Sequence, residues 1–250
     1  MQPATRRWVN AGAFGLALLI NALANVLRLG GYTTGQVSDG FEVVFTPASY
    51  VFAIWGLIYL GLLVYVVYQA RPGPAGAPFQ RELGLLFAVN MVANGAWMVC
   101  WHFLWLLPSV VLMGVMLLTL LLIYLRLGVG VRQVGAATQW LVWAPFSIYF
   151  AWICIATMAN VAVYLEAQGW GGLGLSAIDW TVILLLAGTL LSALISFLRR
   201  DWLFNLVVVW ALVGIFVRNL GAPGYGLVAT IALICAVLAA GGAVAGLIWG

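Results

Sequence analysis

Charged side chains are scarce in this chain of 250 residues, of which aspartate, glutamate, lysine and arginine together make up 6%. Ordinary soluble domains carry roughly four times as many. Hydrophobic residues account for 66%, and the few polar side chains could not cover so large an apolar core in water. A lipid bilayer is itself apolar and removes this difficulty. The chain is therefore expected to be an integral membrane protein whose main partner is the lipid bilayer.

Lysine is absent, and all ten basic residues are arginines. A retinal protein holds its chromophore as a Schiff base on a lysine amine, so that class of protein is excluded. The chain has no P-loop, which excludes ATP-driven transport by this chain alone. No nucleophile stands at a readable spacing from a base and an orienting group, so catalysis is the less favoured function.

Histidine and cysteine are also rare. Cys100, Cys154 and Cys235 lie in separate apolar runs without metal-ligand spacing, so no metal site is expected. His102 is the single histidine. It could serve as one axial haem ligand, although a histidine packed at the membrane interface is the simpler interpretation.

Apolar runs of about 20 residues, separated by Gly- and Pro-rich segments, predict membrane-spanning helices. They show no period-2 alternation, which argues against a β-barrel. The sequence therefore predicts an all-α fold, a polytopic transmembrane bundle of about eight helices. The expected spans are roughly residues 8–29, 47–70, 83–106, 108–127, 137–165, 178–198, 202–217 and 225–249.

The arginines support this count, because eight of the ten fall on one side if every span crosses the membrane. Only Arg28 and Arg218 fall on the other side. An excess of basic residues marks the cytoplasmic face, so both termini are expected in the cytoplasm and the protein in the cell membrane. The first run could instead be a cleavable signal. An uncleaved helix is favoured, because its outer end carries Asn21, Asn25 and Arg28 on one face.

Polar and aromatic residues form stripes on four of the expected helices, mostly within the outer half of the bilayer. Single members of such stripes are commonly interface belts or helix-bridging amides. Their convergence favours a buried aromatic and polar ligand site. The stripes comprise Asn21, Asn25 and Arg28 on the first helix, Phe52, Trp55 and Tyr59 on the second, Asn90, Asn94, Trp97 and Trp101 on the third, and Tyr149, Trp152, Ala156 and Asn160 on the fifth.

Three of these segments resemble motifs of the TspO/translocator family, the tryptophan-rich sensory proteins. "PASYVFAIWGLIYLG" resembles the family's second helix, "NGAWMVCWHF" its third and "YFAWICIATMAN" its fifth. The resemblance covers about the first two-thirds of the chain. It departs from the family at Tyr50, where a tryptophan is usual, and in length, since members usually have five helices.

The resemblance implies a TspO-like five-helix transmembrane domain at residues 1–166 and a three-helix extension at residues 167–250. It further implies a pocket, capped by the segment between the first two helices, that binds porphyrin, haem or similar hydrophobic ligands. The residues expected to line it are Tyr50 and the members of the four stripes other than Asn21 and Asn25. No cofactor is required for that role. Arg28 could pair with a propionate there, or it could simply extend to the membrane interface.

Several readings of the function stay open. The first is a membrane-embedded binding protein that acts as sensor or carrier for tetrapyrroles. The second is a secondary transporter or channel for a small solute, and the third an enzyme acting on a bound porphyrin. Glycines such as Gly241, Gly242 and Gly246 would allow close helix contact within one chain or in a homodimer. No nucleic-acid partner is expected, because topology accounts for the arginines.

Overall fold

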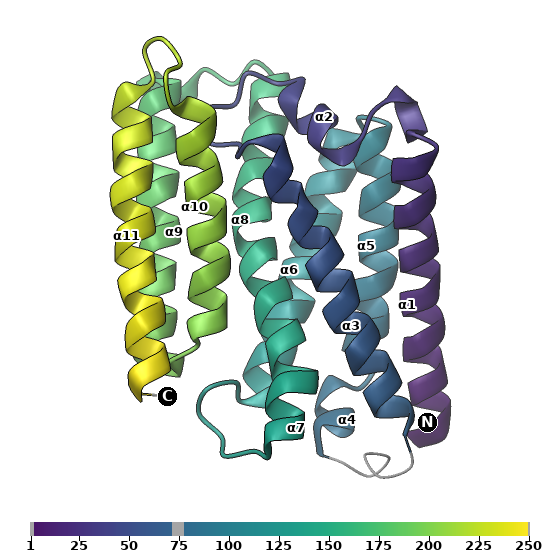
Figure 1. Ribbon diagram of the computed structural model, residues 1–250. Coiled ribbons are helices and arrows are strands. Elements are labelled where there is room, and N and C mark those ends of the chain that lie inside the picture. The colour runs from purple at the N-terminus through teal and green to yellow at the C-terminus, as the bar shows by residue number, and fades with distance from the viewer. Residues whose placement is uncertain (1–2, 72–77, 250) are drawn as a thin grey trace. The chain divides into compact units, whose positions relative to one another are not determined.

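The computed structural model describes residues 3–71 and 78–249, and in these ranges every regular element is a helix. Seven long helices are apolar enough to cross a membrane, which confirms a multi-pass helical membrane protein (Figure 1). They contain α1 (Pro3–Val26), α3 (Ile54–Ala70), α6 (Leu106–Leu127), α8 (Ala144–Ala167), α9 (Ala177–Arg199), α10 (Trp202–Asn219) and α11 (Gly226–Trp249). The span of α3 begins earlier, at Ser49, and that of α8 at Ala136, because short helical turns lead into both helices.

The expected third span is shorter than its apolar run. It corresponds to α5 (Leu86–His102), a helix of 17 residues at the lower end of the length that crosses a bilayer. Gly84 and Leu104 have left-handed φ values of 54° and 58°, and these interrupt the helix on either side. Before Gly84 the chain forms a separate short helix, α4 (Pro78–Leu83).

The chain groups into two compact units. The first comprises Met1–Thr34 and Ile54–Phe150, and the second comprises Gly35–Ala53 and Ala151–Gly250. The helix α8 runs through the boundary between them. The sequence predicted a different kind of division, after residue 166, between a ligand-binding domain and a three-helix extension. That division stays a prediction.

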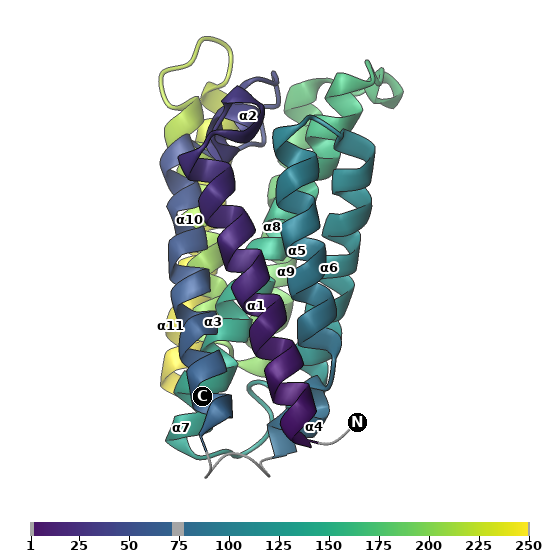
Figure 2. The same ribbon diagram turned by 90° about the vertical axis from the view of Figure 1, so that its right-hand side faces the viewer.

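In the first unit, α5 packs between α1 and α6 (Figure 2). Gly95 allows the approach of α1, because a Cβ atom at this position would lie 3.1 Å from Ile20 Cδ1. The remaining short elements are η1 (Leu29–Gly31), α7 (Ala136–Thr138) and a π-helical turn, η4 (Gln139–Trp143), which precedes α8.

Arginines gather at one end of the first unit. Arg7 donates to the carbonyl oxygen of Gln69 at 3.4 Å, and this contact joins the start of α1 to the end of α3. Arg132 forms an ion pair with Glu82, which joins the segment after α6 to α4. Within this unit the chain segments that the sequence assigned to one side of the membrane therefore meet.

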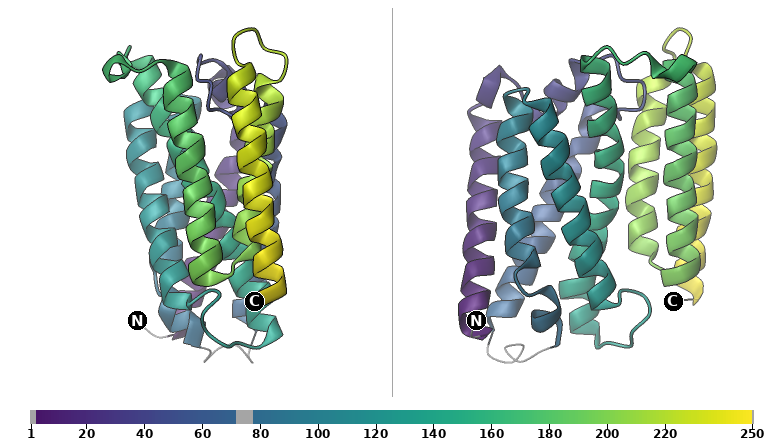
Figure 3. Two further views of the ribbon diagram at one scale, coloured as in Figure 1. Left: turned by 90° about the vertical axis from the view of Figure 1, so that its left-hand side faces the viewer. Right: turned by 180° about the vertical axis from the view of Figure 1, so that it is seen from behind.

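In the second unit, α9, α10 and α11 pack side by side (Figure 3). Asn205 of α10 accepts from Ser192 at 2.6 Å and donates to Ser196 at 2.8 Å, so amide and hydroxyl groups bridge α9 and α10. A Cβ atom at Gly242 would meet Ser196 Oγ at 2.5 Å, and one at Gly246 would lie 2.9 Å from a backbone oxygen of the α9–α10 connection. Two of the three glycines noted in the sequence thus serve helix contact inside the chain.

The second unit also contains Gly35–Ala53, the segment that joins α1 to α3 along the chain. This segment is here called the strap. The sequence placed its part before residue 47 between the first two spans and the rest at the start of the second span. The strap includes most of a short helix, α2 (Thr34–Asp39), and a 3-10 turn, η2 (Ser49–Ala53), which leads into α3.

Candidate functional site

The predicted ligand-binding residues are divided between the two units, and each group is described by itself. The first unit contains Arg28, Trp55, Tyr59, Asn90, Asn94, Trp97, Trp101 and Tyr149, together with His102. The second unit contains Tyr50, Phe52, Trp152, Ala156 and Asn160.

Asn94 is fully buried at the centre of a hydrogen-bond network in the first unit. Its Oδ1 accepts from the Tyr59 hydroxyl at 2.8 Å and from Asn21 Nδ2 at 2.9 Å, and its Nδ2 donates to the Tyr149 hydroxyl at 3.0 Å. The network therefore links α1, α3, α5 and α8. The sequence analysis placed Asn21 on a polar stripe but did not include it among the expected site residues. Its position on the polar face of the first helix was the signal that could have indicated its role.

Aromatic rings surround this network. Trp55 lies 5.7 Å from Tyr59, 5.6 Å from Trp97 and 6.0 Å from Tyr149, measured between ring centroids. Trp97 in turn stacks on Trp101 at 5.9 Å. We call the residues that meet here the aromatic–asparagine cluster: Asn21, Trp55, Tyr59, Asn94, Trp97 and Tyr149.

The spacing within the aromatic–asparagine cluster is that of rings in direct contact. Trp55 is 7% exposed and Trp97 is 3% exposed. A flat ligand can therefore reach these rings in only two ways. It binds against their outer faces, or it enters when the rings move apart.

Asn90 lies outside the cluster, one helical turn before Asn94. Its Nδ2 donates to the carbonyl oxygen of Met116 at 3.1 Å and to Thr119 Oγ1 at 2.8 Å, both on α6. These contacts bridge two helices, which is a common use of a buried asparagine in a membrane protein.

The end of α5 is tied to Thr34. Trp101 Nε1 donates to the Thr34 carbonyl oxygen at 3.1 Å, and Thr34 Oγ1 lies 3.1 Å from His102 Nε2. His102 is 1% exposed, so it could bind haem iron through Nε2 only after giving up this contact. Arg28 is exposed and adopts a left-handed conformation with φ of 48° at the start of η1.

In the second unit, Phe52 of the strap meets Trp152 of α8 edge to face, with ring centroids 5.9 Å apart at 85°. Trp152 is 2% exposed, whereas Phe52 is half-buried. Farther along α8, Ala156 is half-buried and Asn160 is buried. The pair of Phe52 and Trp152 thus forms a second place where predicted site residues come together.

Tyr50 has a partner that the sequence did not indicate. Its ring meets Trp210 of α10 edge to face at 5.4 Å, and 45% of Tyr50 remains exposed. Trp210 lies 160 positions later in the chain (210 − 50) and belongs to no stripe that was predicted to line the site. No local pattern could have signalled this contact.

Comparisons with known proteins place the chain in a family. No curated protein and no solved structure matches it. Residues 7–245 match the family model described as TSPO-like protein, and this range includes the three helices expected as an extension. The chain therefore belongs to the TSPO-like family.

Proposed function

We propose that this protein binds a tetrapyrrole, such as porphyrin or haem, or a similar flat hydrophobic ligand, and acts as its sensor or carrier. The observation that carries the proposal is the set of rings around Trp55, two of which, Tyr59 and Tyr149, are hydrogen-bonded to the buried amide of Asn94. Aromatic faces stack on a flat conjugated ring system. The amides and hydroxyls among these rings can orient polar substituents by exchanging a hydrogen bond within the network for one to the ligand.

Phe52 and Trp152 support the same proposal from within the second unit, because they offer a further pair of aromatic faces. The exposed guanidinium of Arg28 is suited to pair with a propionate carboxylate. Membership of the TSPO-like family agrees with a ligand-binding membrane protein.

A secondary transporter or channel for a small solute is the alternative. The observation in its favour is that four polar side chains from four helices meet inside the first unit. These groups satisfy one another, however, and a hydrated pathway would have to break their hydrogen bonds.

We further propose that the protein lies in the cell membrane with both termini in the cytoplasm. The arginine-rich end of the first unit supports this orientation. A homodimer stays an expectation.

The direct test is a titration of the purified protein with protoporphyrin and haem, followed by quenching of tryptophan fluorescence. We expect saturable binding. Replacing Trp55 or Trp152 by alanine should weaken it by roughly five- to tenfold, because the loss of a stacking face costs about 1 kcal/mol or more. Trp8→Ala is the matched control, since Trp8 is 71% exposed and lies near the start of α1.

Equal affinities for parent, site variants and control would refute a stacking role for these rings. Solute flux through liposomes that hold the protein, without saturable porphyrin binding, would favour the transporter instead.

A further inference from the structure

One face of α10 holds the strap. Trp210, Gly214 and Arg218 are spaced four residues apart, so they lie on the same side of the helix. Trp210 Nε1 donates to the carbonyl oxygen of Val51 at 3.1 Å, and the Gly214 carbonyl oxygen accepts from the backbone N–H of Ala48 at 3.1 Å. Successive turns of α10 thus bind the backbone of the strap at Ala48 and Val51.

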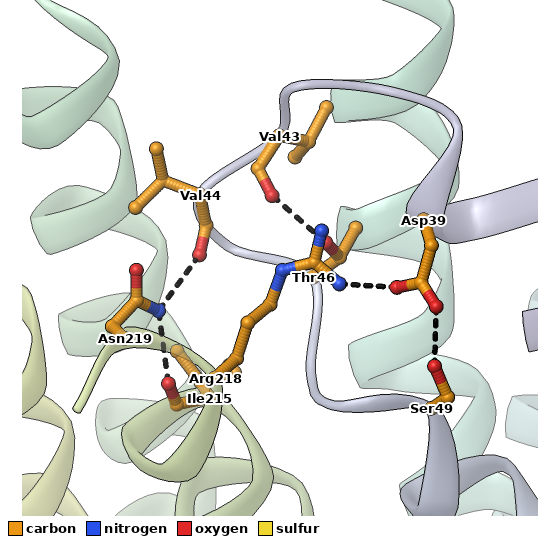
Figure 4. Close-up of polar contacts among 8 residues, drawn as sticks. All are labelled: Asp39, Val43, Val44, Thr46, Ser49, Ile215, Arg218 and Asn219. Carbon is orange, nitrogen blue, oxygen red and sulfur yellow. Dashed lines mark hydrogen bonds and ion pairs between the residues drawn. The ribbon is translucent and has the colours of Figure 1, made fainter. Parts of the chain in front are cut away.

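The strap is also held near the end of α10 (Figure 4). Arg218 forms an ion pair with Asp39, and the same carboxylate accepts from the Ser49 hydroxyl. Asn219 Nδ2 donates to the carbonyl oxygen of Val44 at 3.2 Å. Asp39 therefore joins the two ends of the strap to each other and to α10.

Gly214 determines how closely the strap approaches. A Cβ atom at this position would overlap Val51 Cγ2 and would lie 3.1 Å from Pro47 Cβ. Opposite a valine at position 51, no residue other than glycine fits this contact unless the strap moves away.

One of these contacts satisfies a backbone group that the helix cannot, because the N–H of Ala48 lies ahead of the first turn of η2. Trp210 lies in the middle of α10, which is long and apolar enough to span a membrane. At such a depth the N–H groups at the start of a helix need protein partners, because lipid offers none. The Asp39–Arg218 pair is partly exposed and contributes less, since such pairs are worth about 0–1 kcal/mol.

We propose that α10 positions the ring pair of Phe52 and Trp152 through the strap, and that release of the strap from α10 limits ligand exchange at this pair. Phe52 directly follows Val51, whose carbonyl Trp210 holds, and the Phe52 ring meets Trp152. Moving the strap away from α10 therefore separates Phe52 from Trp152. Trp210 and Gly214 are positioning residues in this scheme, which rests on the proposed tetrapyrrole binding.

The first experiment follows the strap without any ligand. A protease that cuts after glutamate is added to the full chain in nanodiscs, and the cut after the exposed Glu42 is timed against the cut after the exposed Glu166. The protease needs an extended backbone, so the rate at Glu42 follows the released fraction. Trp210→Phe keeps a ring but loses the donor to Val51, and cleavage at Glu42 should rise about fivefold. Trp8→Phe is the control and should leave the rate unchanged.

The second experiment locks the strap. The Cβ position of Gly214 lies 3.4 Å from Val51 Cβ, close to the roughly 3.5–4.5 Å found in disulfides. Val51→Cys combined with Gly214→Cys should therefore cross-link on oxidation. Oxidation should slow both association and dissociation of protoporphyrin at least tenfold, and reduction of the same sample should restore them. Val51→Cys alone is the control, because it keeps Gly214 and oxidation should leave its exchange rates unchanged, the native Cys100, Cys154 and Cys235 being buried.

The outcomes separate the two claims. Unchanged cleavage at Glu42 in Trp210→Phe would overturn the docking of the strap on α10. Equal exchange rates in the oxidised and reduced double variant would overturn its control of the ligand site. If the parent binds no protoporphyrin, the proposed function fails and the control of the site fails with it, while the cleavage rates still decide whether α10 holds the strap.

Discussion

Asn94 donates through Nδ2 to the Tyr149 hydroxyl at 3.0 Å, and among the described residues this is the one hydrogen bond of that amide nitrogen. Asn94 Oδ1, in contrast, has two donors, Tyr59 and Asn21. The two ends of this buried amide therefore differ in how much they lose when one partner is removed.

Tyr149→Phe should destabilise the protein more than Tyr59→Phe. The first change leaves a buried N–H group without an acceptor, which costs on the order of 1–3 kcal/mol. The second leaves Asn94 Oδ1 with Asn21 as its donor, so the loss should be below about 1 kcal/mol. Thermal unfolding of both variants in the same detergent measures the difference. A larger loss for Tyr59→Phe would show that the network is not arranged as described.

Replacing Asn90 should lower the stability of the protein and leave its affinity for the ligand unchanged. Asn90→Leu removes the bridge to Met116 and Thr119, and bridges of this kind in membrane proteins are worth about 0.6 kcal/mol on average. The protoporphyrin Kd should stay within about twofold of the parent. Asn94→Leu is the matched comparison and should weaken binding as well as stability. An equal loss of affinity in both variants would place Asn90 in the ligand site.

Gly30→Ala should be far more damaging than Gly31→Ala. Both glycines have positive φ, at 69° and 92°, so either substitution strains the backbone. A Cβ atom at Gly30 would also overlap the carbonyl oxygen of His102, whereas one at Gly31 would meet open space. Unfolding temperatures of the two variants report the difference. Equal temperatures would mean that η1 does not rest on the end of α5.

The proposed orientation can be read from two cysteines within the first unit. Tyr32→Cys lies on the expected outer side and Gln133→Cys on the inner side, and both positions are exposed. An impermeant thiol reagent added to intact cells should label the first and spare the second. Labelling of the second position alone would reverse the topology.

The helical membrane class could be predicted from the sequence because hydropathy and helical period are local properties. The same is true of the stripe that contains Asn90, Asn94 and Trp97, since residues three and four apart share a helix face. The shortening of the third span also has a local cause, the left-handed conformation of Leu104. A leucine gives no sign of that conformation in the sequence, so the shortening could not be predicted.

Apolar content, a scarcity of charge and the spacing of arginines thus determined by themselves that this chain is a helical membrane protein with polar–aromatic helix faces. Only the tertiary structure decided that Asn94 meets Tyr59, Asn21 and Tyr149 while Asn90 turns to α6. The reason is that a stripe gives the direction of a side chain on its own helix, and the neighbouring helix gives its partner. The contact between the strap and α10 shows this most clearly, because it pairs Asp39 with Arg218, which lie 179 positions apart in the sequence. Such contacts depend on how helices pack, and no local period records them.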